Sequence, residues 1–247
     1  AASESAGGGG GGRVAVKLTD RLADFVTTWT GQIVAYGGGA GTVYEQTGAQ
    51  EDGFGTLIID AGSPSAVSRT PISEGVTETD VGDLIVRNKA VFQVHKNATL
   101  TVNGSITITN GAAFSSMQGS MLELASTNDC RFFGTATPDL YAVSCEVPGK
   151  RVLFGDNFTM KVKSGGSITL KGSREKPLEV LPQNGAAWKL TVGNDAAIDV
   201  AWIESAAGNL MKRSYRAPEW DAQSGFVRAT MQATLYGLVI VPSRRCD

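Results

Sequence analysis

Alternating apolar and polar residues fill residues 83–125, and the second half of this segment repeats the first. A shift of 22 positions superposes residues of the same kind: Leu84 on Ile106, Val86 on Ile108, Asn88 on Asn110, Phe92 on Phe114, Leu100 on Leu122, and Val102 on Leu124. Each unit consists of three short alternating runs separated by Asn/Gly turns, which is the sequence pattern of one turn of a β-solenoid. We therefore expect the paired apolar residues to stack in interior columns, and the two asparagines to form an amide ladder at a turn.

A second repeat occurs later in the chain, with a longer period. A shift of 30 positions superposes four apolar pairs: Met160 on Leu190, Val162 on Val192, Ile168 on Ile198, and Leu170 on Val200. Repeats of a solenoid commonly lengthen by a loop, so both matches are explained by one architecture. With 22 to 30 residues per turn, the pattern predicts roughly nine or ten turns and a rod on the order of 45 Å long.

The alternation divides the chain into three parts. Residues 1–12 are a Gly-rich leader, residues 13–204 are the predicted parallel β-helix, and residues 205–247 are a C-terminal cap or assembly segment. A run of glycines is usually a flexible linker, although it also allows two backbones to approach closely. Within the helix, the Pro- and Ser-rich residues 63–81 and residues 135–150 are expected to form loops.

Two stretches carry a resemblance to known proteins. The segment GSITLKGSREKPLEVLPQNGAAWKLTVGNDAAIDVAWIESA resembles right-handed parallel β-helix proteins of the pectin-lyase-like type. The succession GGGGGGRVAVKL, GQIVAYGGGAGTVYEQ and GTLIIDAG resembles a segment of large secreted or surface-exposed bacterial proteins, of the adhesin and autotransporter-passenger kind. The resemblance implies an all-β, right-handed parallel β-helix in an extracellular or cell-surface setting, and the shared pattern contains no catalytic residues.

Composition and charge narrow the range of partners. The chain has 247 residues, 31 of them Gly, and a net charge of −2 from 22 basic and 24 acidic residues. Charges of both signs are mixed throughout, so we expect no nucleic-acid partner. No apolar run approaches the roughly 20 residues that span a bilayer, so no membrane span is expected. A start at Ala1 without Met is compatible with export and signal-peptide removal, with a fragment of a longer surface protein as the alternative.

Three cysteines leave an odd thiol. Cys130 and Cys145 are close enough in sequence to form a disulfide in an oxidising compartment, and Cys246 would then be available for an intermolecular link. The alternative is that all three are reduced thiols.

A search for catalytic chemistry finds no motif. The only histidine, His95, lies at a predicted strand end, and no Gly-x-Ser-x-Gly elbow, zinc spacing or phosphate-binding loop is present. The acids of the second half belong to no paired-acid or calcium motif: Asp129, Asp139, Glu146, Asp156, Asp195, Asp199 and Glu204. We therefore expect no enzyme activity, catalytic residue, cofactor or metal.

The sequence predicts a non-enzymatic structural protein that associates with itself as a stalk, adhesin segment or fibre subunit. The candidate assembly residues are the glycine tract and the tail: Gly7, Gly8, Gly9, Gly10, Gly11, Gly12, Leu235, Leu238, Ile240 and Cys246. The alternative is a carbohydrate-active enzyme, lyase- or glycosidase-like, or a glycan-binding module. In that case Trp29, Trp188, Trp202 and Trp220 would form a stacking platform for sugars, whereas core or cap packing is their other explanation.

Overall fold

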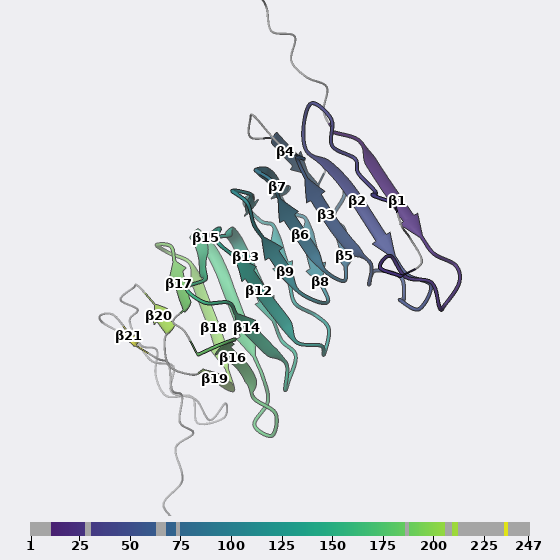
Figure 1. The fold of residues 1–247 in the computed structure, drawn as a ribbon. Helices are drawn as coiled ribbons and strands as arrows, with labels where there is room; N and C mark the ends of the chain where they lie inside the picture. Colours follow the sequence, from purple (N-terminus) through teal and green to yellow (C-terminus); the bar gives the residue numbers. More distant parts are fainter. Residues whose placement is uncertain are drawn as a thin grey trace, which may run out of the picture.

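The computed structural model is an all-β solenoid of about seven turns (Figure 1). It describes residues 11–27, 31–62, 68–72, 75–185, 188–205, 209–211 and 235–236, and these contain no helix, hence none that could cross a membrane. The predicted fold class is confirmed. The expected nine or ten turns were too many, because the first two strands lie outside the regular turns and the later turns contain long loops.

Two sheets run along the rod. The first contains nine strands: β1 (Arg13–Lys17), β2 (Gly41–Gln46), β3 (Thr56–Asp60), β6 (Leu84–Arg87), β9 (Ile106–Ile108), β12 (Cys130–Gly134), β14 (Arg151–Phe154), β16 (Leu178–Pro182) and β19 (Ile203–Ser205). The second contains twelve: β4 (Ser68–Pro71), β5 (Glu78–Val81), β7 (Ala90–Val94), β8 (Thr99–Val102), β10 (Ala113–Ser116), β11 (Met121–Glu123), β13 (Asp139–Cys145), β15 (Thr159–Lys171), β17 (Trp188–Val192), β18 (Ala197–Ala201), β20 (Asn209–Met211) and β21 (Leu235–Tyr236).

Long strands join the two halves of the second sheet. β13 pairs with both β10 and β11, and β15 pairs with both β17 and β18, so each is the counterpart of two short strands in a neighbouring turn. Pairing is parallel throughout the body. The described exceptions lie at the ends, where β2 is antiparallel to β3 and β20 is antiparallel to β21.

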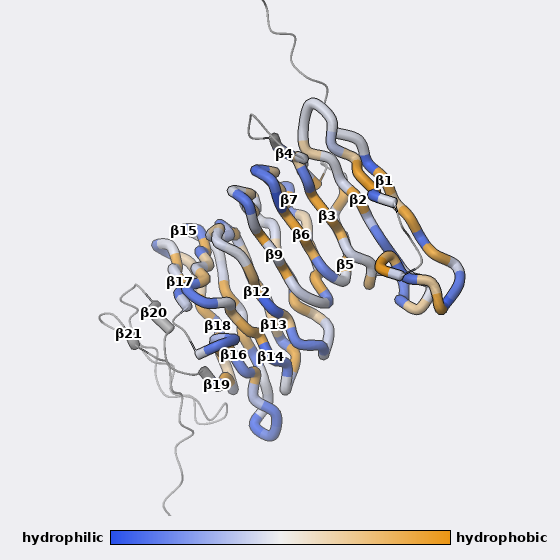
Figure 2. The backbone as a smooth tube through the Cα atoms, viewed as in Figure 1, coloured by the Kyte–Doolittle hydropathy of each residue, from blue (hydrophilic) through white to orange (hydrophobic). Residues whose placement is uncertain are grey.

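The strand register reproduces the sequence repeats. Leu84 pairs with Ile106, and Phe92 pairs with Phe114. In the longer repeat, Met160 pairs with Leu190 and Ile168 with Ile198. Most members of these columns are buried, and Figure 2 shows the accompanying alternation of apolar and polar residues along the strands. Both predicted matches are confirmed as turn-on-turn stacking.

Stacked aromatic rings from both sheets pack in the interior. The rings of Phe92 and Phe114, from the second sheet, stack with centroids 5.5 Å apart. In later turns the first sheet also contributes aromatic residues, where the rings of Phe132 and Phe154 lie 5.1 Å apart, and Trp188 of the second sheet stacks on Phe154.

A ladder of polar side chains runs along the rod, connecting the same Asn/Gly turn in successive coils of the solenoid, as the sequence predicted. The side-chain amide of Asn110 donates to Asn88 Oδ1 at 3.1 Å, and the amide of Asn88 donates to Asp60 Oδ1 at 2.8 Å. Both asparagines have left-handed backbone, with φ of 54° and 58°. Burial alone would raise the pKa of Asp60, but hydrogen bonds from Asn88, Gly62 and Arg87 outweigh it and lower the pKa.

The ladder predicts different losses for two substitutions at one position. Asn110→Gly should lose only the amide hydrogen bond, at about 1 kcal/mol, because Gly accepts positive φ. Asn110→Ala should lose a further ~1 kcal/mol from backbone strain. Urea unfolding of both variants measures the difference, and equal losses would show that the left-handed geometry is not a constraint here.

Candidate functional site

The acidic residues of the second half do not converge on one site. Several of these acids form ion pairs on the outside of the rod, each with a basic residue of a neighbouring turn. Asp129 is 3.4 Å from Arg151, whose guanidinium is also 3.3 Å from Glu179. Lys171 lies 2.7 Å from Asp199 and 3.4 Å from Glu146. In the described part of the chain no group of three His, Cys, Asp or Glu side chains is placed to hold a metal ion.

The predicted disulfide between Cys130 and Cys145 is not found, and both residues are free, buried thiols. Cys130 begins β12 in the first sheet, beside Val152, whereas Cys145 ends β13 in the second sheet, beside Leu170. Each thiol thus fills the place of an apolar side chain in its own core column, where free cysteine behaves as a small hydrophobic residue. Spacing in sequence did not reveal that the two positions belong to different columns.

A buried lysine that the sequence analysis missed lies near both thiols. Lys150 is fully buried, and its Nζ donates to the carbonyl oxygens of Ser126 at 2.6 Å and Asn128 at 2.8 Å. Burial raises the pKa of Cys130 to about 12, an effect that the Lys150 ammonium partly opposes. Burial likewise raises the pKa of Cys145 and lowers the pKa of Lys150. These shifts keep the thiols protonated and therefore poor nucleophiles.

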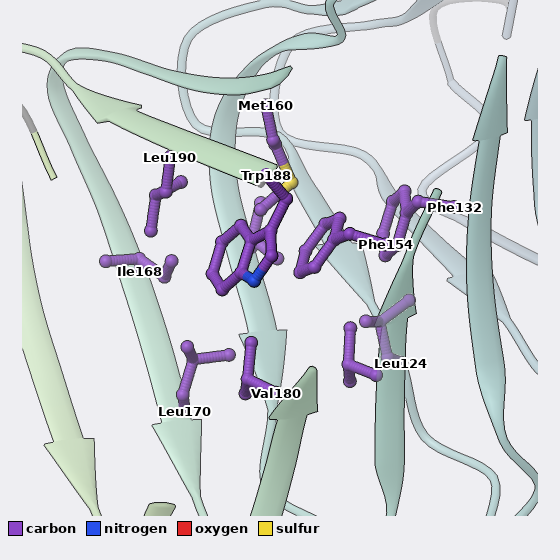
Figure 3. Close-up of a pocket in the computed structure, with 11 residues that line it drawn as sticks. Leu124, Phe132, Phe154, Met160, Ile168, Leu170, Val180, Trp188 and Leu190 are labelled. Atoms are coloured by element: carbon purple, nitrogen blue, oxygen red, sulfur yellow. The ribbon is translucent and has the colours of Figure 1, made fainter. Parts of the chain in front are cut away.

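Within the described residues, a small gap in the interior is lined by apolar residues (Figure 3). Its volume is about 20 Å³, room for roughly one water molecule. Trp188 borders it, stacked on Phe154 with centroids 4.3 Å apart, and the indole Nε1 has no hydrogen-bond partner. A water there would find too few polar partners, so the gap is a packing defect and not a ligand site.

The structure also places two of the four tryptophans of the predicted sugar platform. Trp188 is 2% exposed and belongs to the core, as the packing explanation expected, so it offers no surface to a sugar ring. Trp202 is half-buried between β18 and β19, and Trp29 and Trp220 lie outside the described residues.

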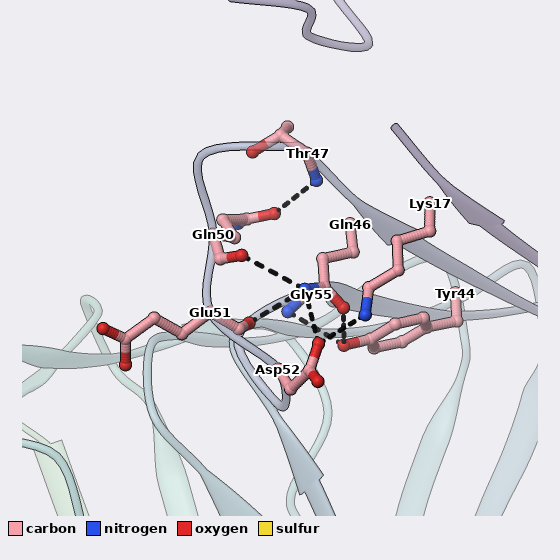
Figure 4. Close-up of polar contacts among 8 residues, drawn as sticks. All are labelled: Lys17, Tyr44, Gln46, Thr47, Gln50, Glu51, Asp52 and Gly55. Atoms are coloured by element: carbon pink, nitrogen blue, oxygen red, sulfur yellow. Dashed lines mark hydrogen bonds and ion pairs between the residues drawn. The ribbon is translucent and has the colours of Figure 1, made fainter. Parts of the chain in front are cut away.

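At the N-terminal end, an antiparallel hairpin replaces the regular turns (Figure 4). Its loop, residues 47–55, is organised by Gln46, whose amide donates to the carbonyl oxygens of Gln50 at 3.2 Å and Glu51 at 3.0 Å. The Tyr44 hydroxyl donates to Gln46 Oε1, and Lys17 forms an ion pair with Asp52. These contacts join β1, β2 and the loop into one unit.

The candidate assembly residues are only partly placed. Gly11 and Gly12 lie against their own chain: a Cβ on Gly11 would be 2.4 Å from the Ala40 carbonyl, and the Gly12 N–H donates to Ala35 O at 2.6 Å. This is the close backbone approach that glycine allows, which was the alternative to a flexible linker. Leu235 begins β21, opposite Met211. Gly7, Gly8, Gly9, Gly10, Leu238, Ile240 and Cys246 lie outside the described residues.

Comparison with known proteins gives only short similarities. A stretch of 52 residues, 21% of this chain, is 46% identical to the ATP-dependent RNA helicase HrpA of Escherichia coli. A stretch of 49 residues is 45% identical to the HrpA homolog of Haemophilus influenzae. The chain spans about 4% of the length of each helicase. No family model and no solved structure matches.

The thiols predict how stability changes at high pH. An unfolded thiol ionises near pH 9, whereas folded Cys130 keeps its proton to about pH 12. Between these values the folded state binds more protons, so the free energy of unfolding falls as pH rises, by at most ~1.4 kcal/mol per pH unit for each thiol. The lowered pKa of Lys150 acts in the opposite sense below its ordinary value of 10.5.

Replacing Cys130 by Val, the residue beside it in register, should therefore reduce the loss of stability between pH 8.5 and 10. Urea unfolding at several pH values measures this slope. Val152→Ala, in the same column, should lower stability without changing its pH dependence. A Cys130→Val variant with the wild-type slope would contradict the assignment.

The gap predicts a stabilising substitution. Val180→Ile adds one methylene at the gap and should raise the free energy of unfolding by up to ~0.8 kcal/mol. The matched control is Val86→Ile, at a fully buried position of the same sheet away from the gap, where overpacking should cost about 1–3 kcal/mol. Thermal and urea unfolding compare the two variants. Equal effects on the free energy of unfolding would show that there is no more room for a methylene beside Val180 than beside Val86.

Proposed function

We propose that this chain is a non-enzymatic structural module, an extracellular or cell-surface β-solenoid that associates with itself as a stalk, adhesin segment or fibre subunit. The observation that supports this most directly is that side chains on both faces of the sheets connect neighbouring turns. Across about seven turns the inward residues form columns, and several outward acids, Asp129 and Asp199 among them, are paired with bases of neighbouring turns. Both arrangements hold one turn on the next.

A rod of this kind holds its two ends at a fixed separation, which is what a stalk or fibre requires. Stability of a solenoid is roughly a sum of turn stabilities and contacts between neighbouring turns, so its length can be extended without redesigning the core. The ends are where such a rod must be covered, and they are its natural sites of association.

The short similarity to an RNA helicase does not support a helicase proposal. It concerns a fifth of this chain and 4% of the helicase. The glycan-binding alternative has lost Trp188 as a platform residue, and nothing in the described residues favours it over the structural proposal.

Sedimentation equilibrium and electron microscopy over a wide concentration range test the proposal. We expect species larger than the monomer, whose population rises with concentration. A glycan array and a polysaccharide-cleavage panel are run on the same material. Monomers at all concentrations would contradict self-association, and a specific glycan signal or cleavage product would favour the alternative.

A further inference from the structure

The chain itself closes the N-terminal end of the rod over its core. The Thr70 hydroxyl, in the first strand of the second sheet, donates to the Ala40 carbonyl at 3.1 Å. Tyr36 packs so closely on Gly62 that a Cβ there would lie 2.6 Å from the aromatic ring. The loop at Gly53 likewise lies against β5. These contacts cover the end of the core, so the end face itself offers little room for a partner.

The edge strand β1 differs, because one of its sides is open. β1 ends the first sheet, pairs with β2 alone among the described strands, and contains no buried residue (Figure 1). The Gly12 carbonyl accepts from Thr42 N–H at 3.0 Å, and Leu18 N–H donates to Gln46 O at 2.9 Å. Even-numbered residues therefore face β2, and alternation turns the N–H and C=O of Ala15 to the open side. An exposed edge of this kind is a template for another strand.

The sequence of β1 indicates which strand fits this edge. It reads RVAVK, so from either end the order is basic, Val, Ala, Val, basic. Antiparallel pairing of two such strands about Ala15 places Ala15 opposite its counterpart and Val14 opposite Val16. The two alanines would exchange both N–H···O bonds, and the valines would occupy the non-hydrogen-bonded pairs, where side chains lie closer together. A second copy of this chain therefore fits the edge.

An apolar row on one face of the sheet leads to this edge and ends there. Ile58 of β3 lies beside Val43 of β2, and Val43 lies beside Val14 of β1. Val43 is 3% exposed, whereas Val14 is 36% exposed because no further strand covers it. Val16 of a second copy would continue the row and remove Val14 from water. Apolar burial of this kind favours association.

The basic residues at the ends of β1 do not prevent this pairing. Arg13 would lie opposite Lys17 of the other copy, and like charges in opposed positions are destabilising. Lys17 is already in an ion pair with Asp52, however, and Arg13 also interacts within its own chain (Figure 4). The Asp52 carboxylate would therefore lie near both cations at each end of the strand pair. The local charge is then partly neutralised without any rearrangement.

We propose that two copies of this chain pair antiparallel along β1, about a two-fold axis at Ala15, so that the first sheet continues from one copy into the other. The inference rests on the self-association of the proposed function and names its surface. The contact uses the same edge of both copies and therefore closes at a dimer. The two rods lie end to end with their C-terminal ends pointing apart.

A charge pair introduced across the axis tests the register. Val14→Asp or Val16→Lys alone places a charge opposite a valine twice in each dimer, and should raise the dimer dissociation constant by roughly tenfold or more in sedimentation experiments. An equimolar mixture should restore dimers, because the new carboxylate and ammonium then lie opposite each other. The matched control, Met117→Asp, changes a residue of similar exposure, 37%, on the body of the rod and should leave dimerisation unchanged.

A cross-link at the axis tests the same geometry directly. Facing Cα atoms of a hydrogen-bonded antiparallel pair lie about 5.5 Å apart, which a disulfide can bridge. Ala15→Cys, combined with Cys246→Ser, should therefore give a covalent dimer on mild oxidation, seen by non-reducing electrophoresis. Met117→Cys in the same background should remain monomeric on the gel.

Circular dichroism and thermal unfolding confirm that each variant is folded before its association is compared. In a wild type that associates, unchanged association of both charge variants without a cross-link would overturn this interface and leave the proposed function standing. Loss that mixing does not restore would also overturn it, because the edge would then bind a different strand. A wild type that never associates would contradict both proposals.

Discussion

Every feature of this rod depends on in-register stacking of parallel strands. Each residue lies about 4.8 Å from its equivalent in the next turn, so it must be compatible with that one neighbour before any other. Leu84 lies on Ile106 and Phe132 on Phe154, because a column that mixed large and small residues at random would leave gaps. The gap lies where Trp188, the largest side chain in the core, stacks on Phe154, and the smaller Leu190 of the same strand and Val180 of β16 also line it.

The same constraint acts on the outer face. Arg151 contacts Asp129 in the preceding turn and Glu179 in the following one, at 3.4 and 3.3 Å. Such exposed pairs individually contribute little to stability. Their effect is on register, because a slip by one residue would place like charges or apolar residues in contact along the whole rod. Charge pairing and core packing therefore specify the same alignment of turns.

The body of the fold could be predicted from sequence because equivalent positions in neighbouring turns carry residues of the same kind. Asn88 and Asn110 were identifiable as a ladder by their 22-residue spacing, and the strands around them by period-two alternation. The same alternation cannot separate parallel from antiparallel pairing, so the hairpin of β2 and β3 was not predicted. The number of turns was overestimated for the same reason, because strands outside the repeat were counted within it.

Lys150 shows most clearly what periodicity does not reveal. It is the last residue of the predicted loop 135–150, two positions after Pro148, and its chemistry predicts exposure. In the structure it precedes Arg151, which pairs with Glu179, so it occupies the level of the buried Leu178 one turn later. A leucine there would leave the carbonyls of Ser126 and Asn128 without a donor, whereas the ammonium satisfies both. The two carbonyl groups in the loop of the preceding turn, and not the stacked Leu178 of the following turn, therefore determine which residue occupies this position.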